Sequence, residues 1–415
     1  MKVTTFRSQA TEVKPAIETF AKIKVVGVGG AGGEAVNRMM GSKIRGVDFI
    51  VVNTDAQALH HSKAPTKIHV GKTTTKGLGS GMDPEMGRKA AEENQEELHE
   101  FLKGADMVFV TCGLGGGTGT GAGPIVAEIA RDLGALTIGV VTKPFEFEGA
   151  QRRNIAERGL RDFEERVDAL ITIPNDRILQ VIDKKTSLLD AFAVVDQILQ
   201  QGVQGISDVI TTPGIINVDF ADVKAIMSGT GSALMGIGIA SGENRAVEAA
   251  KAAIESPLLE LSVEGAKGIL FTIAGGKDLG MHEVNEAAKI ITASASPDAR
   301  IIFGAIVDEA LADDEMKVTV IATGFGSEGT RAAPAQRNVR PMTLQRDEPG
   351  KGEGNLWQKP ARKIYVEPEE ARERAPERVR SAQNSPNSPA EKATGQAGQE
   401  DEDLEIPAFI RKKMM

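Results

Sequence analysis

The segment that most constrains the fold of this chain is the glycine-rich run CGLGGGTGTG at residues 112–121. It overlaps the end of the apolar ADMVFVTCG (105–113), which is typical of a buried strand, and precedes the helical PIVAEIARDLG (124–134). Glycine lets backbone N–H groups approach a ligand closely, and a helix N-terminus favours anions. Thr118 and Thr120 add hydroxyls suited to phosphate oxygens or a metal shell. The run therefore predicts a phosphate-binding loop, because a purely structural turn would not need so many glycines.

A second glycine cluster, GVGGAGG at residues 27–33, joins an apolar strand (22–29) to a helical segment (34–42). Its GxGxxG spacing is typical of dinucleotide-binding folds, but a tight turn without a ligand would also show it. Two glycine loops on one sheet could enclose a chain of phosphates from two sides. The pair therefore favours a nucleotide with several phosphates over an NAD(P)-dependent oxidoreductase, which would leave the run at 112–121 unexplained.

Apolar strands alternate with helical segments through the first half of the chain. Further strands are predicted at 47–55, 136–144 and 169–175, and further helices at 84–102 and 152–167. Continuous apolar strands separated by helices indicate a Rossmann-like α/β domain, in which a parallel sheet is covered on both faces. The loops that follow such strands meet at one edge of the sheet, where ligands bind.

A long amphipathic pattern at 187–212 predicts a central helix that is long enough to connect two domains. A smaller mixed α/β region follows it. Its predicted strands are 232–240, 268–275, 299–308 and 316–324, and its predicted helices are 245–256 and 282–295. The short segment LADDE between the last two strands predicts a hairpin that pairs them directly.

Composition and motif content exclude several classes of protein. The formal charge of −9 argues against general binding of nucleic acids, and a single cysteine, Cys112, excludes an internal disulfide. No run of 18 apolar residues occurs and no signal-peptide pattern begins the chain, so we expect a cytoplasmic protein without direct membrane insertion. Gly71-Lys72-Thr73 lacks the upstream glycine of a P-loop, and the histidines lack metal-ligand spacing, so no protein-bound metal site is predicted.

The C-terminal part of the chain has a different composition. Residues 331–402 hold 8 of the 18 prolines and few apolar residues, which predicts a disordered linker. The final DLEIPAFIRKKMM (403–415) is a short apolar and basic segment. It is either a frayed terminus or a peptide that docks on a partner, and an apolar segment placed after a long linker favours docking.

Several motifs together resemble the tubulin/FtsZ family of GTPases. They are GGGTGTG (115–121), VNTDAQAL (52–59), KPFEFEG (143–149), IPND (173–176) and NVDFADV (217–223), and DLEIPAFIRKK (403–413) is similar to the family's tail peptide. The resemblance covers residues 22–326 and the tail. It implies a protein that binds and hydrolyses GTP and polymerises head-to-tail into the filaments of the bacterial division ring, at mid-cell.

The resemblance also implies a division of the chain. The expected parts are a flexible N-terminal extension (1–21), a GTP-binding domain (22–186), the central helix (187–212), a second α/β domain with the catalytic loop (213–326), the linker (327–402) and the partner-binding peptide (403–415). Expected partners are other copies of the chain and membrane adaptors such as FtsA. The adaptor would bind through Ile406, Pro407, Phe409, Ile410 and Arg411. A nucleic-acid partner is not expected.

The nucleotide site that the resemblance implies takes GTP or GDP, with Mg²⁺ accompanying the nucleotide. Its residues are Gly30, Ala31, Gly32, Gly33, Glu34, Asn53, Gly115, Gly116, Gly117, Thr118, Gly119, Thr120, Glu148, Arg152, Asn175, Phe192 and Asp196. The two glycine loops would hold the phosphates and Glu148 the ribose. Phe192 would stack on guanine and Asp196 would accept its N1–H and amino hydrogen bonds. From the residues alone, a core position on the central helix is the favoured interpretation of Phe192.

The resemblance assigns hydrolysis to Asp219 and Asp222, assisted by Asn217, which would reach the γ-phosphate of the next subunit. The residues alone favour helix capping instead, since both acids lie at a helix start. The sequence departs from the family pattern in two places. Glu34 replaces a common Asn, and LGSGMDPEMG (78–87) replaces a loop that commonly reads LGAGANPE, with Met82 and Asp83 on the γ-phosphate side.

Two alternative functions remain within this family. One is a tubulin-like filament that positions DNA, and the terminal IPAFIRKK argues against it. The other is a structural homologue without hydrolysis, which the presence of both Asp219 and Asp222 disfavours.

Overall fold

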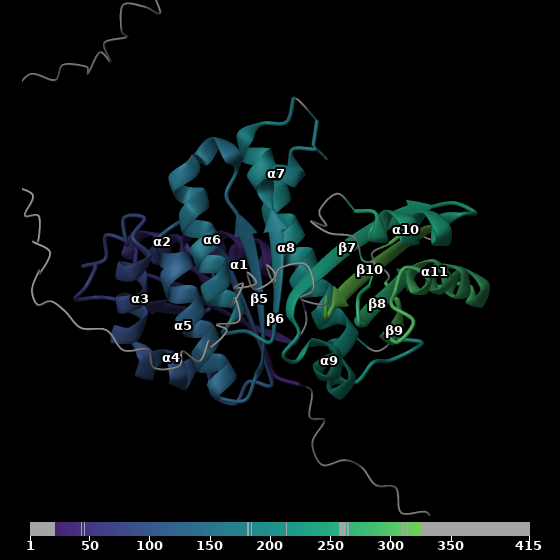
Figure 1. Cartoon of the computed structure of the whole chain (residues 1–415), viewed down its shortest axis with the longest axis horizontal. Coiled ribbons are helices and arrows are strands. Elements are labelled where there is room, and N and C mark those ends of the chain that lie inside the picture. Colours follow the sequence, from purple (N-terminus) through teal and green to yellow (C-terminus); the bar gives the residue numbers. More distant parts are fainter. Residues whose placement is uncertain are drawn as a thin grey trace, which may run out of the picture. The chain divides into compact units, whose positions relative to one another are not determined.

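The structure is a computed structural model that describes residues 21–325 apart from 43, 45, 181, 184, 213, 257–262, 264, 309–310 and 313 (Figure 1). The chain divides into two units, 1–337 and 338–415, and every element described below belongs to the first. The predicted linker and the adaptor-binding residues Ile406, Pro407, Phe409, Ile410 and Arg411 lie outside the described residues.

Within the described residues, ten strands form one sheet in the order β3-β2-β1-β4-β5-β6-β7-β10-β8-β9. They are β1 (Ile23–Val28), β2 (Val47–Asn53), β3 (Thr66–His69), β4 (Met107–Gly113), β5 (Leu136–Lys143), β6 (Ala169–Pro174), β7 (Gly231–Ser241), β8 (Gly268–Gly275), β9 (Arg300–Val307) and β10 (Glu315–Thr323). Strands β1 to β6 are parallel to their neighbours, as the apolar runs predict. The pairing of β6 with β7 continues the sheet into the second α/β region.

Helices cover both faces of this sheet, which confirms the predicted α/β fold. They are α1 (Gly29–Gly41), α2 (Ala56–His61), α3 (Pro84–Glu93), α4 (Gln95–Leu102), α5 (Thr118–Asp132), α6 (Ala150–Glu164), α7 (Asn175–Ile178), α8 (Leu188–Thr211), α9 (Phe220–Met227), α10 (Arg245–Ile254), α11 (Met281–Ala293) and the 3₁₀ turn η1 (Glu146–Glu148). One apolar core lies between the sheet and α1, α8 and α9, and a second lies under α3 to α6. Helices α10 and α11 enclose a third core on β8 and β10 (Figure 1).

The predicted hairpin between the last two strands is wrong. Strand β8 lies between them, parallel to β9 and antiparallel to β10, which pairs with β7 on its other side. Every residue of β8 is buried, so burial requires an interior position for this strand. Strand β9 keeps exposed residues near its start and takes the edge. The burial of β8 on both faces therefore determines the strand order, although the connection between β9 and β10 is short.

The helical segment predicted at 84–102 is two helices. The break falls at Asn94, whose Oδ1 accepts a hydrogen bond from the Gly71 amide at 2.9 Å while its Nδ2 donates to Glu97 at 3.0 Å. An asparagine side chain that bonds to backbone outside its own helix competes with helix continuation. The break anchors the loop that begins at Gly71 and leads toward the site.

The two helices that follow the glycine loops begin earlier than predicted. Helix α1 begins at Gly29 instead of 34, and α5 at Thr118 instead of 124. The glycine loops therefore supply the first helical turn themselves, and Pro124 lies inside α5. As a consequence, the unpaired N–H groups of both first turns belong to the glycine loops.

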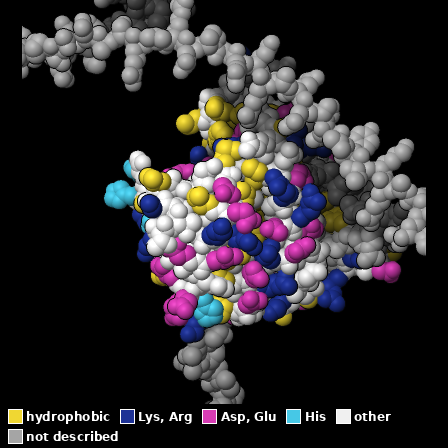
Figure 2. Space-filling view, turned by 60° about the vertical axis from the view of Figure 1, so that its left-hand side comes forward, with side chains coloured by type: hydrophobic (Ala, Val, Ile, Leu, Met, Phe, Trp, Pro, Cys, Tyr) yellow, Lys and Arg dark blue, Asp and Glu magenta, His cyan; other side chains and the backbone are white. Residues whose placement is uncertain are grey.

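The surface charges and the length of the helices of this unit can be compared with those of nucleic-acid-binding and membrane-spanning proteins. Figure 2 shows acidic and basic side chains interspersed on one face rather than gathered into a patch of one sign. Among the described helices, none combines the length and apolar character that a membrane span requires.

Arg245 at the start of α10 joins this helix to α11. Arg245 is 4% exposed, and its guanidinium donates to both carboxylate oxygens of Glu283 at 2.7 and 2.9 Å and lies 2.7 Å from Asp278. Glu283 also accepts from the Gly280 amide at the start of α11. The hydrogen bond from Arg245 lowers the pKa of Glu283. The pair thus fixes the two helix starts together.

Replacing Arg245 with alanine is expected to lower the free energy of unfolding by about 2 kcal/mol, because Glu283 would keep its charge without its partner. This loss is smaller than that for a fully buried ion pair, since Glu283 and Asp278 are partly solvated. Urea denaturation measures the change, with the exposed Lys251→Ala on the same helix as the control, expected within about 0.5 kcal/mol of the parent. Equal midpoints for the two variants would contradict the role of the pair.

Candidate functional site

A cavity of about 570 Å³ opens at the carboxyl ends of the parallel strands. Residues that end or directly follow β1, β2, β4, β5 and β6 line it, together with the loop before α3 and one face of α8. This edge is where the sequence places a ligand, and the volume is in the range of nucleotide-sized ligand sites.

The cavity brings together most of the predicted nucleotide residues. Those that line it are Gly30, Ala31, Asn53, Gly116, Gly117, Thr118, Gly119, Glu148, Arg152, Asn175, Phe192 and Asp196. Gly32, Gly33, Glu34, Gly115 and Thr120 do not line it. Gly32 lies behind its loop, where a Cβ would be 2.3 Å from the Thr111 carbonyl oxygen. The Thr120 hydroxyl accepts from the Gly115 amide at 3.0 Å, so this pair shapes the second loop.

The glycine loops give one part of the cavity the character of an anion site. Neither α1 nor α5 has a side chain that caps its N-terminus, and neither has an acidic residue in its first turn. Their first backbone N–H groups therefore lack an intrahelical acceptor, and both helix dipoles favour negative charge at this point. This is the arrangement that binds phosphate.

A different set of groups lines the cavity near β6 and α8. Asn175 follows β6 and is 5% exposed, and its Oδ1 has no hydrogen-bond partner among the described residues. Asp196 of α8 accepts from Arg38 of α1 at 2.8 Å. Burial raises the pKa of Asp196, the bond to Arg38 opposes the rise, and the charge of Glu34 adds to it. An unused buried acceptor and a partly desolvated carboxylate that line the same cavity favour a ligand that donates hydrogen bonds.

Phe192 lies at the mouth of the cavity. It is 40% exposed, and it contacts the buried Phe145 edge-to-face with ring centroids 5.5 Å apart. Part of the Phe192 side chain is therefore accessible to a planar ligand. A core position would have buried the whole ring.

Glu148 and Arg152 form the side of the cavity near β5. The Glu148 carboxylate accepts from Arg152 at 2.7 Å and from the Phe145 amide at 3.0 Å, so its position is fixed from both sides. The two residues are four apart, on η1 and in the first turn of α6. They present a carboxylate and a guanidinium to the same ligand.

The predicted catalytic residues lie elsewhere in the chain. Asp219 caps α9 by accepting from the Asp222 amide at 2.8 Å, as the capping interpretation predicts, and Asn217 accepts from the Gly214 amide at 2.7 Å. All three side chains are exposed, and none lines the cavity. One copy of the chain therefore does not bring these acids to its own candidate site.

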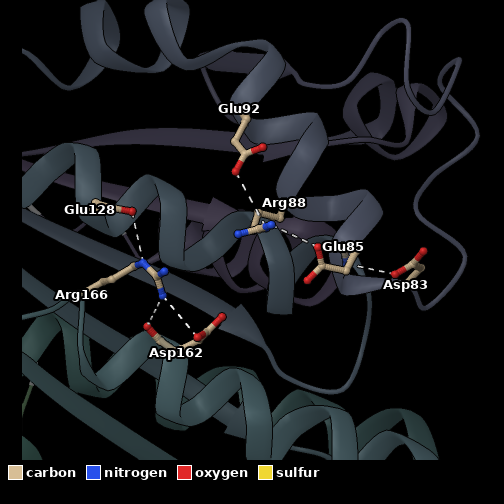
Figure 3. Close-up of polar contacts among 7 residues, drawn as sticks. All are labelled: Asp83, Glu85, Arg88, Glu92, Glu128, Asp162 and Arg166. Carbon is tan, nitrogen blue, oxygen red and sulfur yellow. Dashed lines mark hydrogen bonds and ion pairs between the residues drawn. The ribbon is translucent and has the colours of Figure 1, made fainter.

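Other residues line the cavity besides the predicted nucleotide residues. Ser80 and Thr142 were not identified from the sequence, Asp55 belongs to the motif at 52–59, and Met82 lies in the segment that the resemblance placed on the γ-phosphate side. Asp83, placed there too, instead caps α3 through the Glu85 amide at 3.0 Å (Figure 3). Ser80 belongs to the segment that departs from the family pattern, but the side chains that Ser80 contacts could be identified only from the fold.

A second cavity of about 750 Å³ lies between α3, α5 and α6 and shares Met82 with the first. Arg88 beside it contacts Glu85 and Glu92 of its own helix, and Arg166 joins Asp162 on α6 to Glu128 on α5 (Figure 3). The carboxylates of Glu85 and Asp162 are engaged in these pairs, and that of Asp83 caps α3. No orphaned buried acceptor of the described residues lines this second cavity. The first cavity is therefore the stronger candidate.

Comparison with known proteins gives two family matches and a set of similar structures. Residues 22–183 match the Tubulin/FtsZ family, GTPase domain, and residues 231–326 match the FtsZ family, C-terminal domain. A structure of FtsZ from M. jannaschii, an empty dimer, is 44% identical with a TM-score of 0.71 and covers 75% of this chain and 89% of that one.

Two more distant structures share the fold alone. CetZ1 from Haloferax volcanii, a GDP-bound monomer, is 21% identical with a TM-score of 0.64, over 74% of this chain and 94% of that one. CetZ2 from the same organism, a GTPγS-bound protofilament, is 22% identical with a TM-score of 0.62, over 72% and 92%.

Proposed function

Because this chain belongs to the tubulin/FtsZ family of GTPases, we propose that it binds GTP in the cavity between its glycine loops and hydrolyses it between subunits of a head-to-tail filament. The observation that carries the proposal is the chemical contrast within the cavity. Two uncapped helix N-termini supply N–H donors, whereas Asn175 and Asp196 supply acceptors. A guanine nucleotide has the complementary order of groups, with donors on the base and acceptors on the phosphates.

The guanine end of the nucleotide is assigned to Asp196, Asn175 and Phe192. An aspartate accepts from the N1–H and the amino group of guanine together, whereas adenine offers no such pair of donors. Arg38 occupies one oxygen of Asp196 and opposes its protonation, so the carboxylate remains an acceptor despite its burial. Phe192 would stack on the base, and Glu148 would contact the ribose.

The phosphates are assigned to the two glycine loops. Gly30 and Ala31 open α1 and Gly116 to Gly119 lead into α5, so the phosphate chain would meet the N–H groups of both. Gly32, Gly33, Gly115 and Thr120 would support these loops from behind.

We assign Mg²⁺ to the nucleotide rather than to a site made by the protein alone. The described residues contain no group of three potential metal ligands. Mg²⁺ does not require three protein ligands, because it commonly takes one or two carboxylates together with phosphate oxygens and water. Asp55 supplies a carboxylate on the cavity wall. Its Oδ1 accepts hydrogen bonds from the Gln57 and Ala58 amides of α2, so Oδ2 is the oxygen suited to an ion. When bound, the ion offsets phosphate charge.

Hydrolysis is assigned to a second subunit. Asn217, Asp219 and Asp222 are exposed and lie outside the cavity of their own chain, so a neighbouring copy has to present them. A contact that joins this surface to the cavity mouth of the next copy is heterologous, and repeating it gives an open filament. GTP turnover would then depend on assembly.

The cellular role is proposed from the resemblance. The filaments would form the cytoplasmic division ring at mid-cell, and Ile406, Pro407, Phe409, Ile410 and Arg411 would attach them to a membrane adaptor such as FtsA. These residues lie outside the described part of the chain, so adaptor binding stays a prediction.

The test of the proposal is the dependence of GTPase activity on protein concentration. Phosphate release and light scattering are followed together in a dilution series of the full chain. We expect the specific activity to rise steeply at the concentration where scattering appears. A specific activity independent of concentration would contradict catalysis between subunits, while GTP binding without hydrolysis at any concentration would favour a structural homologue.

A further inference from the structure

Three hydroxyl groups meet beside the phosphate end of the cavity. The Thr118 Oγ1 lies 2.7 Å from the Thr54 Oγ1 and 2.9 Å from the Ser80 Oγ. All three residues are buried, with exposed fractions of 0% for Thr54, 5% for Ser80 and 9% for Thr118. They come from the end of β2, the loop before α3 and the first residue of α5. Ser80 and Thr118 line the cavity.

Ser80 begins a turn that is pressed against the second glycine loop. Its carbonyl accepts from the Asp83 amide at 2.9 Å, and the two residues between them, Gly81 and Met82, have positive φ angles of 57° and 63°. This is the φ pattern of a type I′ turn, which is strained for methionine. A Cβ on Gly117 would lie 2.3 Å from the Ser80 Oγ and 2.8 Å from the Asp83 amide. The turn therefore needs fixed ends.

Both ends of the turn are fixed by side chains. Asp83 caps α3 at one end (Figure 3), and the Ser80 hydroxyl bonds to Thr118 at the other. The second bond attaches a strained turn to the first residue of α5. Loss of the Ser80 hydroxyl would release the turn from the glycine loop without removing any cavity-lining backbone.

The hydroxyl cluster has one proton that it can donate to a ligand. Three hydroxyls carry three protons, and the two contacts among them use two. When Ser80 and Thr54 both donate to Thr118, the Thr118 proton is left over. Thr118 lines the cavity, and a buried donor requires an acceptor, so this proton fits an anionic oxygen of the ligand.

The order of the strands in the sheet indicates which phosphate of the nucleotide lies near Thr118. Asn175 follows β6, whereas Thr54 follows β2 and the 78–82 loop bridges to Asp55 beyond it. Strands β1, β4 and β5 separate β2 from β6 in the sheet. With the base held near β6 and the glycine loops of β1 and β4 in between, the far end of the phosphate chain points toward Ser80.

We propose that Ser80 is a positioning residue that favours GTP over GDP. By donating to Thr118 it makes Thr118 a donor to the terminal phosphate, and it holds the turn at Gly81 and Met82 beside that phosphate. The inference rests on the proposed placement of the nucleotide in this cavity. It concerns a side chain of this chain, at a position where the family commonly has alanine.

The test is the ratio of the affinities for a non-hydrolysable GTP analogue and for GDP. Both are measured by competition at a protein concentration below assembly. Ser80→Ala is expected to lower the ratio about tenfold, because the affinity for the GTP analogue falls while the affinity for GDP stays near the parent value. Ser80→Thr keeps a hydroxyl and is expected to restore most of the ratio. The matched control is Ser62→Ala, which removes an equally buried hydroxyl bonded to Asn37 outside the cavity and is expected to leave the ratio unchanged.

An unchanged ratio in Ser80→Ala would overturn the proposal, whether both affinities stay at the parent value or fall by the same factor. A purely structural role of Ser80 predicts one of these two results. If Ser80→Ala does not fold, Thr54→Val removes the other donor to Thr118 with little change of shape and is expected to lower the same ratio. An unchanged ratio there would equally overturn the proposal. If the parent chain binds neither nucleotide, the proposed function fails and the inference fails with it.

Discussion

Replacing Asp222 with alanine is expected to leave GTP binding unchanged and to lower GTP hydrolysis about 100-fold or more. Phosphoryl transfer depends mainly on positioning and charge, and removing a group that positions the attacking water has effects of this size. The Asp222 backbone amide, not its carboxylate, completes the cap with Asp219. Asp222→Ala therefore leaves the start of α9 intact, whereas Asp219→Ala would also cost about 1 kcal/mol of helix stability.

A mixing experiment tests whether the acid acts on a neighbouring subunit. Asp222→Ala keeps its cavity but lacks the acid, and Asp196→Ala keeps the acid but loses the proposed guanine contact. Each variant alone is expected to be nearly inactive, while an equimolar mixture recovers activity because one subunit supplies what the other lacks. Exposed Lys224→Ala on the same helix is the control, and it should keep most of the parent activity. A mixture as inactive as its components would contradict the assignment.

Replacing Asp196 with asparagine is expected to weaken GTP binding by about 10- to 100-fold and to improve binding of xanthosine triphosphate. The carboxylate accepts two guanine donors, and a charged hydrogen bond contributes about 1.5 to 3 kcal/mol. Xanthine carries a carbonyl oxygen where guanine has its amino group, so an asparagine amide can donate to it. Competition between the two nucleotides measures the exchange directly.

Asp190→Asn is the matched control for this variant, since Asp190 is an exposed acid of the same helix that does not line the cavity. It should keep the parent preference for GTP. Equal losses in both variants, or no gain for xanthosine triphosphate in Asp196→Asn, would place the base elsewhere.

A pH series adds a second readout for Asp196. Burial raises the pKa of this carboxyl, so it protonates at a higher pH than an exposed aspartate. Protonation removes an acceptor, so the GTP affinity of the parent and that of the Asp190→Asn control should fall together on mild acidification. The Asp196→Asn variant lacks the titrating group and should lose this component of the pH dependence.

Much of the fold could be predicted from local sequence patterns. The apolar runs predicted β1, β4 and β8 within two residues at either end, because a strand buried on both faces must be apolar along its length. The central helix was predicted as 187–212 and is Leu188–Thr211. The hairpin failed because strand order depends on which strand needs burial, and a short connection does not determine that.

The sequence by itself determined the fold class, the family and the position of the two glycine loops of this protein, because periodicity and clustered glycines are local properties that any fold of the chain must accommodate. The tertiary structure decided how the site is completed. Arg38 meets Asp196 across 158 residues, and Thr118 meets Thr54 and Ser80 across 64 and 38. It also decided that the acids of α9 stay outside their own cavity. Such contacts join segments that only the sheet order brings together, so no local pattern of residues encodes them.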